Sequence, residues 1–139
     1  MINANGNDVL MAVVEVQKDG FTAYLDVPGH AVTSAGESLF ELRANLQEAL
    51  ELFLETAEEL GIDTQHIKGK KVELRLDVKQ LFTLFESINI SGFAAYSGIN
   101  RSLLNQYAKG IKIPSEKQSL RILKGLHNLG RELISIYAM

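Results

Sequence analysis

The chain has 139 residues, of which 46% are apolar and none is cysteine, and its formal net charge is -3 at pH 7. This length allows one substantial core or two small ones and is too short for a multi-domain enzyme, and the lack of cysteine excludes disulfides, thiolate nucleophiles and cysteine-based zinc sites. Because no apolar run of about 18 residues and no signal-peptide pattern occurs, we expect a cytoplasmic protein without membrane contact.

Three short strands are expected at the start of the chain. Residues 9–16 are rich in Val, Leu and Met, and the Asp-Gly pair at 19–20 is suited to the positive φ of a tight hairpin. Apolar and polar residues then alternate over 21–27, which is typical of a half-buried strand. A Pro-Gly turn at 28–29 leads into a third predicted strand at 30–36.

A long amphipathic helix is expected between Ser38 and Gly61. Ser38 and Glu41 have the spacing of a capping box, and apolar residues then recur at helical spacing until the glycine. A fourth strand is expected at 71–77, where apolar and charged residues alternate. The first half of the chain is therefore predicted to be a β-β-β-α-β sheet with one covering helix.

The run from Tyr24 to Glu55, YLDVPGHAVTSAGESLFELRANLQEALELFLE, resembles the N-terminal domain of HicB-type antitoxins. The shared pattern is a strand, a Pro-Gly turn, a short strand, a Gly-x-Ser/Thr step and a helix rich in Glu, Ala and Leu. The resemblance covers roughly residues 9–78 and implies a truncated ribonuclease H-like fold without nuclease activity. It also implies binding to a HicA-like ribonuclease toxin, which is small and basic. One departure is His30, where many relatives carry cysteine.

The second half begins with another cap. Asp77 and Gln80 have capping-box spacing, and we expect the helix that follows to reach Ile88. The next window, residues 90–109, fits the helix-turn-helix template, which needs a small residue at position five and glycine at position nine. These positions hold Ala94 and Gly98, and the four apolar positions hold Phe93, Ile99, Leu104 and Tyr107.

Two residues of this window depart from the template. Ser97 stands where an apolar residue is usual, and Gly92 inside the first helix costs about 1 kcal/mol of helix propensity. The alternative interpretation is an ordinary all-helical core in which glycine and alanine fall into register by accident.

The window and the sequence after it resemble the Cro/repressor-type, or xenobiotic-response-element-type, helix-turn-helix domain. The turn of that family is echoed by residues 98–101, and its Asn-Gly and Pro are echoed by Gly110, Pro114 and an apolar helix from Ser119. Such a domain is a known C-terminal attachment of HicB-type proteins. The overall expectation is an α+β protein with a HicB-like toxin-binding domain at 1–77 and a DNA-binding and dimerisation domain at 78–139.

Seven residues are the candidates for contact with double-stranded operator DNA. Asn100 is expected to cap the recognition helix, and the Arg, Ser, Asn and Gln side chains after it are expected to meet base edges. Lys109 and Lys112 lie nearer the helix end, where phosphate contact is expected. For each residue taken alone, the alternative is a solvated surface position. The seven are Asn100, Arg101, Ser102, Asn105, Gln106, Lys109 and Lys112.

One such module buries too little surface for tight specific binding, so we expect a homodimer or a higher homo-oligomer on a two-fold operator. Half-sites are then about 34 Å apart or a multiple of that distance. The C-terminal tail is more apolar than a free terminus needs to be, which predicts a role in this assembly. Its apolar residues include Leu133, Ile134, Ile136 and Tyr137.

Charge is segregated along the chain. Residues 1–80 hold 7 Lys and Arg against 14 Asp and Glu, a net charge of -7, whereas residues 81–139 hold 7 against 3, a net charge of +4. The first half would repel nucleic acid and attract a basic partner, unless the asymmetry is accidental. Tyr24 and Asp26 are the candidates for toxin contact, and the glutamates along the predicted helix are a rival surface or simply a solvated face.

No catalytic, cofactor or metal site is expected. The three histidines, His30, His66 and His127, lack metal-ligand spacing, and the strands lack the several carboxylates that a ribonuclease H site needs. The sequence favours an antitoxin that neutralises a HicA-like ribonuclease and represses its own operon. The alternative is a stand-alone transcription regulator whose N-terminal domain senses a ligand or mediates assembly.

Overall fold

The computed structural model of the protein describes residues 8–27 and 29–139. Within these ranges the fold is α+β, with one four-stranded mixed sheet and five helices, which confirms the expected fold class. The chain divides into two compact units, one that ends at Leu76 and one that begins at Asp77. No helix in the described ranges is long and apolar enough to cross a membrane.

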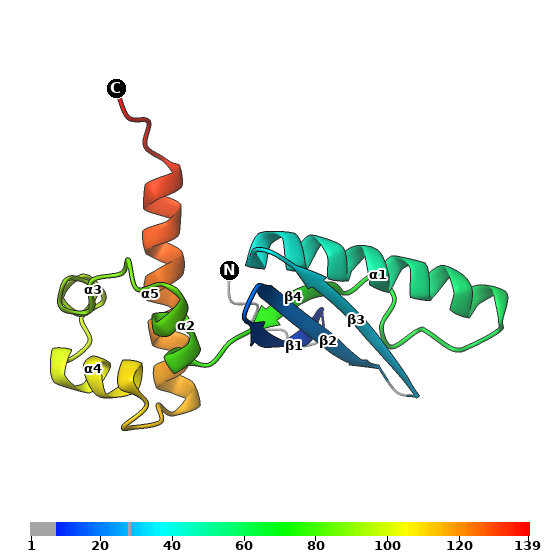
Figure 1. Ribbon diagram of the computed structural model, residues 1–139, viewed down its shortest axis with the longest axis horizontal. Coiled ribbons are helices and arrows are strands. Elements are labelled where there is room, and N and C mark those ends of the chain that lie inside the picture. The colour runs from blue at the N-terminus through cyan, green and yellow to red at the C-terminus, as the bar shows by residue number, and fades with distance from the viewer. Residues whose placement is uncertain (1–7, 28) are drawn as a thin grey trace. The chain divides into compact units, whose positions relative to one another are not determined.

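The first unit is a sheet with one helix packed along it. The strands lie in the order β3-β2-β1-β4, and neighbours are antiparallel except β4, which runs parallel to β1. Figure 1 shows α1 along one face of this sheet. The predicted order of strands and helix is confirmed. The elements are β1 (Val9–Gln17), β2 (Gly20–Val27), β3 (His30–Gly36), α1 (Leu39–Glu59) and β4 (Lys71–Arg75).

The hairpin between β1 and β2 depends on Gly20. Gln17 pairs with Gly20, so the loop has two residues, Lys18 and Asp19. Gly20 has a φ of 153°, and a Cβ atom there would lie 2.7 Å from the carbonyl oxygen of Gly36 on β3. Because backbone sterics disfavour this φ for L side chains and the neighbouring strand leaves no room, only glycine fits.

The core of the first unit lies between α1 and the sheet. In β2 and β4 every second residue faces α1, as the alternation predicts, and β1 and β3 follow the same pattern. Most side chains of the opposite face are exposed. We call the exposed set Met11, Val13, Tyr24 and Thr33 the open sheet face; Tyr24 pairs with both Val13 and Thr33. The buried core residues are Ala12, Val14, Ala23, Leu25, Val27, Val32, Leu42, Leu46, Leu50, Ile67 and Val72.

Side chains of α1 bind the backbone of both outer strands. On β4, Arg43 donates from Nε to the carbonyl oxygen of Val72 at 3.0 Å, and the amide of Val72 donates to Gln47 Oε1 at 3.2 Å. On β3, Asn45 donates from Nδ2 to the carbonyl oxygen of Ala35 at 2.8 Å. These bonds satisfy polar backbone groups that strand pairing leaves free at the margins of a sheet.

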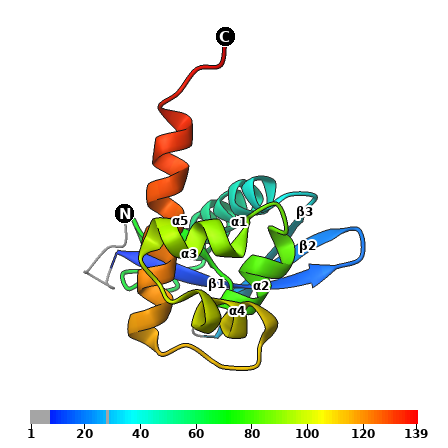
Figure 2. The ribbon, with the colours of Figure 1, turned by 90° about the vertical axis from the view of Figure 1, so that its left-hand side faces the viewer.

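The second unit consists of four helices, which Figure 2 shows from a direction in which α3, the turn after it and α4 are visible. Each helix begins with a side-chain cap. Asp77 and Gln80 form the predicted capping box with both of its hydrogen bonds, and Asn89, Asn100 and Ser115 cap the later helices. The helices are α2 (Val78–Leu84), α3 (Ile90–Ser97), α4 (Arg101–Lys109) and α5 (Glu116–Ile134).

Three predicted boundaries are wrong. β4 ends at Arg75 and not at 77, because Asp77 is taken up by the cap of α2. α2 ends at Leu84 and not at Ile88, because the chain must leave the helix before Asn89 caps α3. The last helix starts three residues before Ser119 and includes part of the predicted tail.

α5 contains two glycines, Gly125 and Gly130. At Gly125, a Cβ atom would lie 3.0 Å from Cζ of Phe93 and 3.1 Å from Cβ of Ser97, both on α3. The glycine therefore lets α5 approach α3 closely. Tertiary packing outweighs the low helix propensity of glycine here. The buried hydrophobic residues of this unit are Val78, Phe82, Phe93, Ala94, Ile99, Leu104, Tyr107 and Ile122.

Candidate nucleic-acid interface

The turn between α3 and α4 has the geometry that its sequence predicts. Gly98 is left-handed, with φ 71° and ψ 22°, and the amide of Ile99 donates to the carbonyl oxygen of Ala94 at 3.1 Å. Asn100 then accepts the amide of Leu103 at its Oδ1, at 3.0 Å, so its predicted role as a cap is confirmed. With Ile99 buried in the core, these contacts fix the direction in which α4 leaves the turn.

α4 separates its apolar and polar side chains onto opposite sides. Leu104 and Tyr107 are buried beneath it. At about 100° per residue, the polar side chains fill one arc of roughly 140° on the other side. Of the candidate residues, Arg101, Ser102 and Lys109 are exposed and Asn105 and Gln106 are half-buried. We call this set the α4 polar face; it consists of Arg101, Ser102, Asn105, Gln106 and Lys109.

Three lysines lie at or near the C-terminal end of α4, and Lys109 is in its last turn. Gly110 is left-handed, with φ 75°, and Lys112 follows it as an exposed residue of the next turn. Lys79 of α2 lies over the same glycine, since a Cβ atom on Gly110 would be 2.8 Å from Cδ of Lys79 and 3.4 Å from its Nζ. Lys79 was not among the predicted residues, because no local pattern links positions so far apart in the sequence.

Within the described residues, the cations of this surface form no ion pair. The ion pair that the described residues do form lies in the first unit, where Arg43 Nη2 is 3.0 Å from Glu73 Oε1. Both of its side chains are about half exposed, so it contributes about 0–1 kcal/mol. Arg101, Lys109 and Lys112 make no ion pair to the described part of the chain. Their charges are available to an anionic partner.

The candidate partner surface of the first unit is only partly described. Tyr24 has 39% of its surface exposed on the open sheet face, beside Val13 and Met11, which are also exposed. The side chain of Asp26 lies outside the described residues. The rival surface is the back of α1, where all the glutamates are exposed: Glu41, Glu48, Glu51, Glu55, Glu58 and Glu59.

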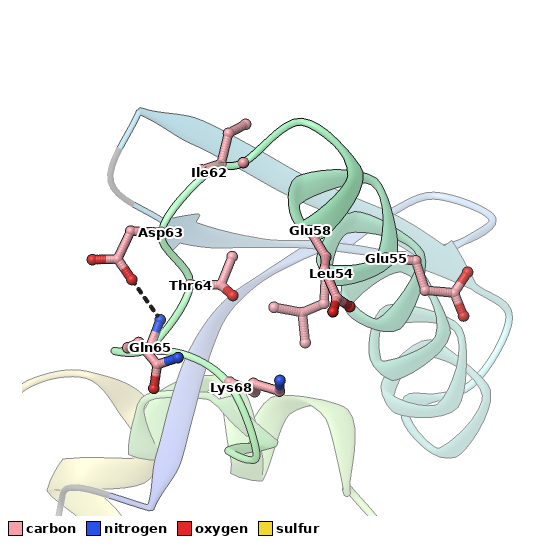
Figure 3. Close-up of a pocket in the computed structure, with 9 residues that line it drawn as sticks. Leu54, Glu55, Glu58, Ile62, Asp63, Thr64, Gln65 and Lys68 are labelled. Atoms are coloured by element: carbon pink, nitrogen blue, oxygen red, sulfur yellow. Dashed lines mark hydrogen bonds between the residues drawn. The ribbon is translucent and has the colours of Figure 1, made fainter.

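A pocket of about 360 Å³ lies between the C-terminal half of α1 and the segment 61–68 (Figure 3). Its lining includes Glu55, Glu58, Asp63 and Lys68. Figure 3 shows the carboxylates of Glu55 and Asp63 pointing away from each other, and Asp63 accepts the amide of Gln65 at 3.1 Å. Over the described residues, no three histidine or acidic side chains are grouped so that they could hold a metal ion.

No family model, curated protein or solved structure matches the chain. The α4 polar face is the best-defined surface of the two units. It combines a capped helix, a left-handed glycine on either side and cations without carboxylate partners among the described residues.

Proposed function

We propose that the second unit binds double-stranded DNA by placing α4 in the major groove, as a helix-turn-helix domain. The observation that carries this proposal is the α4 polar face, which lies opposite buried Leu104 and Tyr107. The major groove is wide enough for an α-helix and displays a distinct donor and acceptor pattern for each base pair. A helix whose outward arc holds Arg, Asn and Gln side chains is suited to that pattern.

The residues of this surface then divide into two roles. Arg101 can make two hydrogen bonds to guanine, and Asn105 or Gln106 can make two to adenine. Lys109, Lys112 and Lys79 gather at the end of α4, where they can contact phosphates and set the register of the protein on the duplex. Base contacts would supply specificity and phosphate contacts most of the salt-dependent affinity.

DNA binding is tested by selection from a randomised duplex library with the full chain. We expect one enriched sequence with two-fold symmetry, bound more tightly than an unrelated duplex and with affinity that falls steeply with salt. The variant Arg101→Ala should lose the preference for that sequence. If the selection enriches no sequence at any salt concentration, α4 does not recognise bases.

For the whole chain, we infer an antitoxin that represses its own operon and neutralises a HicA-like ribonuclease through its first unit. The order β3-β2-β1-β4, with β4 parallel to β1 and α1 on one face, agrees with the truncated ribonuclease H-like fold that the resemblance implies. The excess of acidic residues in this half of the sequence supports attraction of a basic partner. Co-expression with the product of the neighbouring gene tests the idea, because a small basic protein should be recovered in equal amount.

The second candidate function is a stand-alone transcription regulator with a ligand-sensing first unit. The observation behind it is the open pocket beside α1, which is lined mainly by polar residues and whose volume of about 360 Å³ is within the range of small-molecule sites. In that case no protein partner is recovered, and a metabolite extract shifts the affinity for the selected duplex. The two candidates share the proposal for α4 and differ only in the partner of the first unit.

A further inference from the structure

A side chain of α5 holds the turn that orients α4. Arg121 donates from Nη2 to the carbonyl oxygen of Gly98 at 2.8 Å, across 23 positions of sequence. Gly98 is the left-handed residue at which the chain leaves α3, and Asn100, two residues later, caps α4. A bond to this carbonyl therefore acts at the point where the relative direction of α3 and α4 is set.

Close packing of α5 on α3 brings Arg121 within reach of the turn. Gly125 is one helical turn after Arg121 on roughly the same side of α5. Because Gly125 has no side chain, α5 can approach Phe93 and Ser97 closely. A Cβ atom on Gly125 would lie 3.0 Å from Cζ of Phe93 and 3.1 Å from Cβ of Ser97. Ser97 directly precedes Gly98, so the contact at Gly125 and the hydrogen bond at Arg121 hold consecutive residues of α3 and the turn.

The guanidinium of Arg121 makes no other hydrogen bond to the described residues. It is exposed and makes no ion pair there, so the bond to Gly98 is the interaction that orders it. A hydrogen bond from a charged donor is stronger than one between neutral groups. Its bond to the turn distinguishes Arg121 from Lys124, which is also an exposed cation on α5 but makes no hydrogen bond to the turn.

We propose that Arg121 is a positioning residue for DNA recognition: through the carbonyl of Gly98 it sets the angle at which the α4 polar face meets the bases. This inference rests on the proposed DNA binding by α4. Base contacts need accurate placement of Arg101 and Gln106, whereas phosphate contacts tolerate displacement. Loss of Arg121 therefore weakens specific binding and leaves non-specific binding nearly unchanged.

The test compares Arg121→Met with Lys124→Met in the full chain. Each variant loses one exposed positive charge from α5, and only the first loses the bond to Gly98. Affinity is measured for a duplex that the wild-type protein selects from a randomised library and for an unrelated duplex, over a series of salt concentrations. Relative to Lys124→Met, Arg121→Met should bind the selected duplex roughly tenfold more weakly, with the unrelated duplex and the salt slope unchanged.

Three results would overturn the proposal. If both duplexes weaken equally and the salt slope falls by about 1, Arg121 contacts phosphate directly. If both weaken equally and the melting temperature falls, its role is structural. Equal binding by the two variants would show that the bond to Gly98 has no effect on recognition.

Failure of the proposed function itself is distinguishable. If the wild-type protein selects no sequence, the proposal of DNA recognition by α4 is wrong. Amide hydrogen exchange then tests whether the bond from Arg121 to Gly98 stabilises the turn. Arg121→Met should then speed exchange at Ile99 and Leu103 relative to Lys124→Met. Unchanged exchange at both amides would show that the bond from Arg121 to Gly98 does not stabilise the turn.

Discussion

Gly125 of α5 and Phe93 of α3 are so close that a Cβ atom on the glycine would lie 3.0 Å from Cζ of the ring. The substitution Gly125→Ala gains about 1 kcal/mol of helix propensity but adds a methyl group to a filled contact, at a cost of about 1–3 kcal/mol. Ser97 Cβ, 3.1 Å away, is fixed to the backbone of α3 and cannot move aside. We expect a net loss of up to about 2 kcal/mol in the free energy of unfolding by urea.

Gly130→Ala is the matched control on the same helix. A Cβ atom at Gly130 would have no heavy atom within 4 Å, so the substitution adds helix propensity without crowding. We expect this variant to be more stable than the wild type by about 0.5–1 kcal/mol. Stabilisation by both substitutions would contradict the close approach of α5 to α3.

Lys109 is predicted to contact phosphate and not a base. Lys109→Ala should weaken the selected and the unrelated duplex by the same factor and lower the salt slope by about 1, because one fewer counterion is released. Fluorescence anisotropy titrations at several salt concentrations measure both quantities, with Lys124→Ala as the control. A loss confined to the selected duplex would instead assign Lys109 to base recognition.

Gln106 is predicted to contact a base. Gln106→Ala should relax the preference at one base pair of the selected sequence and weaken its binding by about 1–3 kcal/mol. Repeating the library selection with the variant locates the affected base pair. An unchanged selected sequence would place Gln106 outside the groove.

The C-terminal end of α5 is predicted to join two copies of the chain. Leu126, Leu129 and Leu133 continue the side of α5 that buries Ile122, and the spacing of four, three and four residues keeps them on one face. In Figures 1 and 2 the last turns of α5 extend beyond α2, α3 and α4, and Leu133 is 58% and Ile134 86% exposed. An apolar stripe that leaves its own core in this way is suited to a second copy.

Removal of the residues after Arg131 should therefore give a monomer with weakened affinity for the selected duplex. Sedimentation velocity measures the mass, and Ile113→Asp is the control, because Ile113 is 91% exposed in the same unit but lies outside α5. A truncated chain that still sediments as a dimer would exclude this end of α5 as the interface.

Tyr24 is predicted to contact the partner of the first unit. Tyr24→Lys places a positive charge on the open sheet face, which should abolish recovery of a basic partner in co-expression. Leu52→Lys, on the exposed back of α1, separates the two candidate surfaces. Loss of recovery with Leu52→Lys alone would assign the contact to the acidic back of α1.

The local elements of this fold were predictable because their signals lie within a few residues of one another. The cap of α1 by Ser38 and the capping box of Asp77 and Gln80 follow from side chains three positions apart. The left-handed conformation of Gly98 follows likewise, since a close crossing of two short helices requires it. The outward placement of the α4 polar face follows from helical spacing.

What could not be predicted depends on contacts between distant segments. α5 passes through Gly125 because Phe93 and Ser97 leave no room for a side chain, and nothing in the sequence around Gly125 indicates that contact. The positions of Lys79 over Gly110 and of Arg121 at the turn have the same origin. Lys79 reaches the proposed interface, and Arg121 reaches the turn that positions it, only through the tertiary fold.

The bonds from Arg43 and Gln47 to the backbone of Val72 also bear on the solubility of the protein. Extended segments of other chains can pair with the unprotected edge strand of a folded protein and start a fibril. At Val72 such a segment would first have to displace two side chains of α1. By covering the backbone of Val72, α1, which also supplies part of the hydrophobic core, should reduce pairing of this edge strand with other chains.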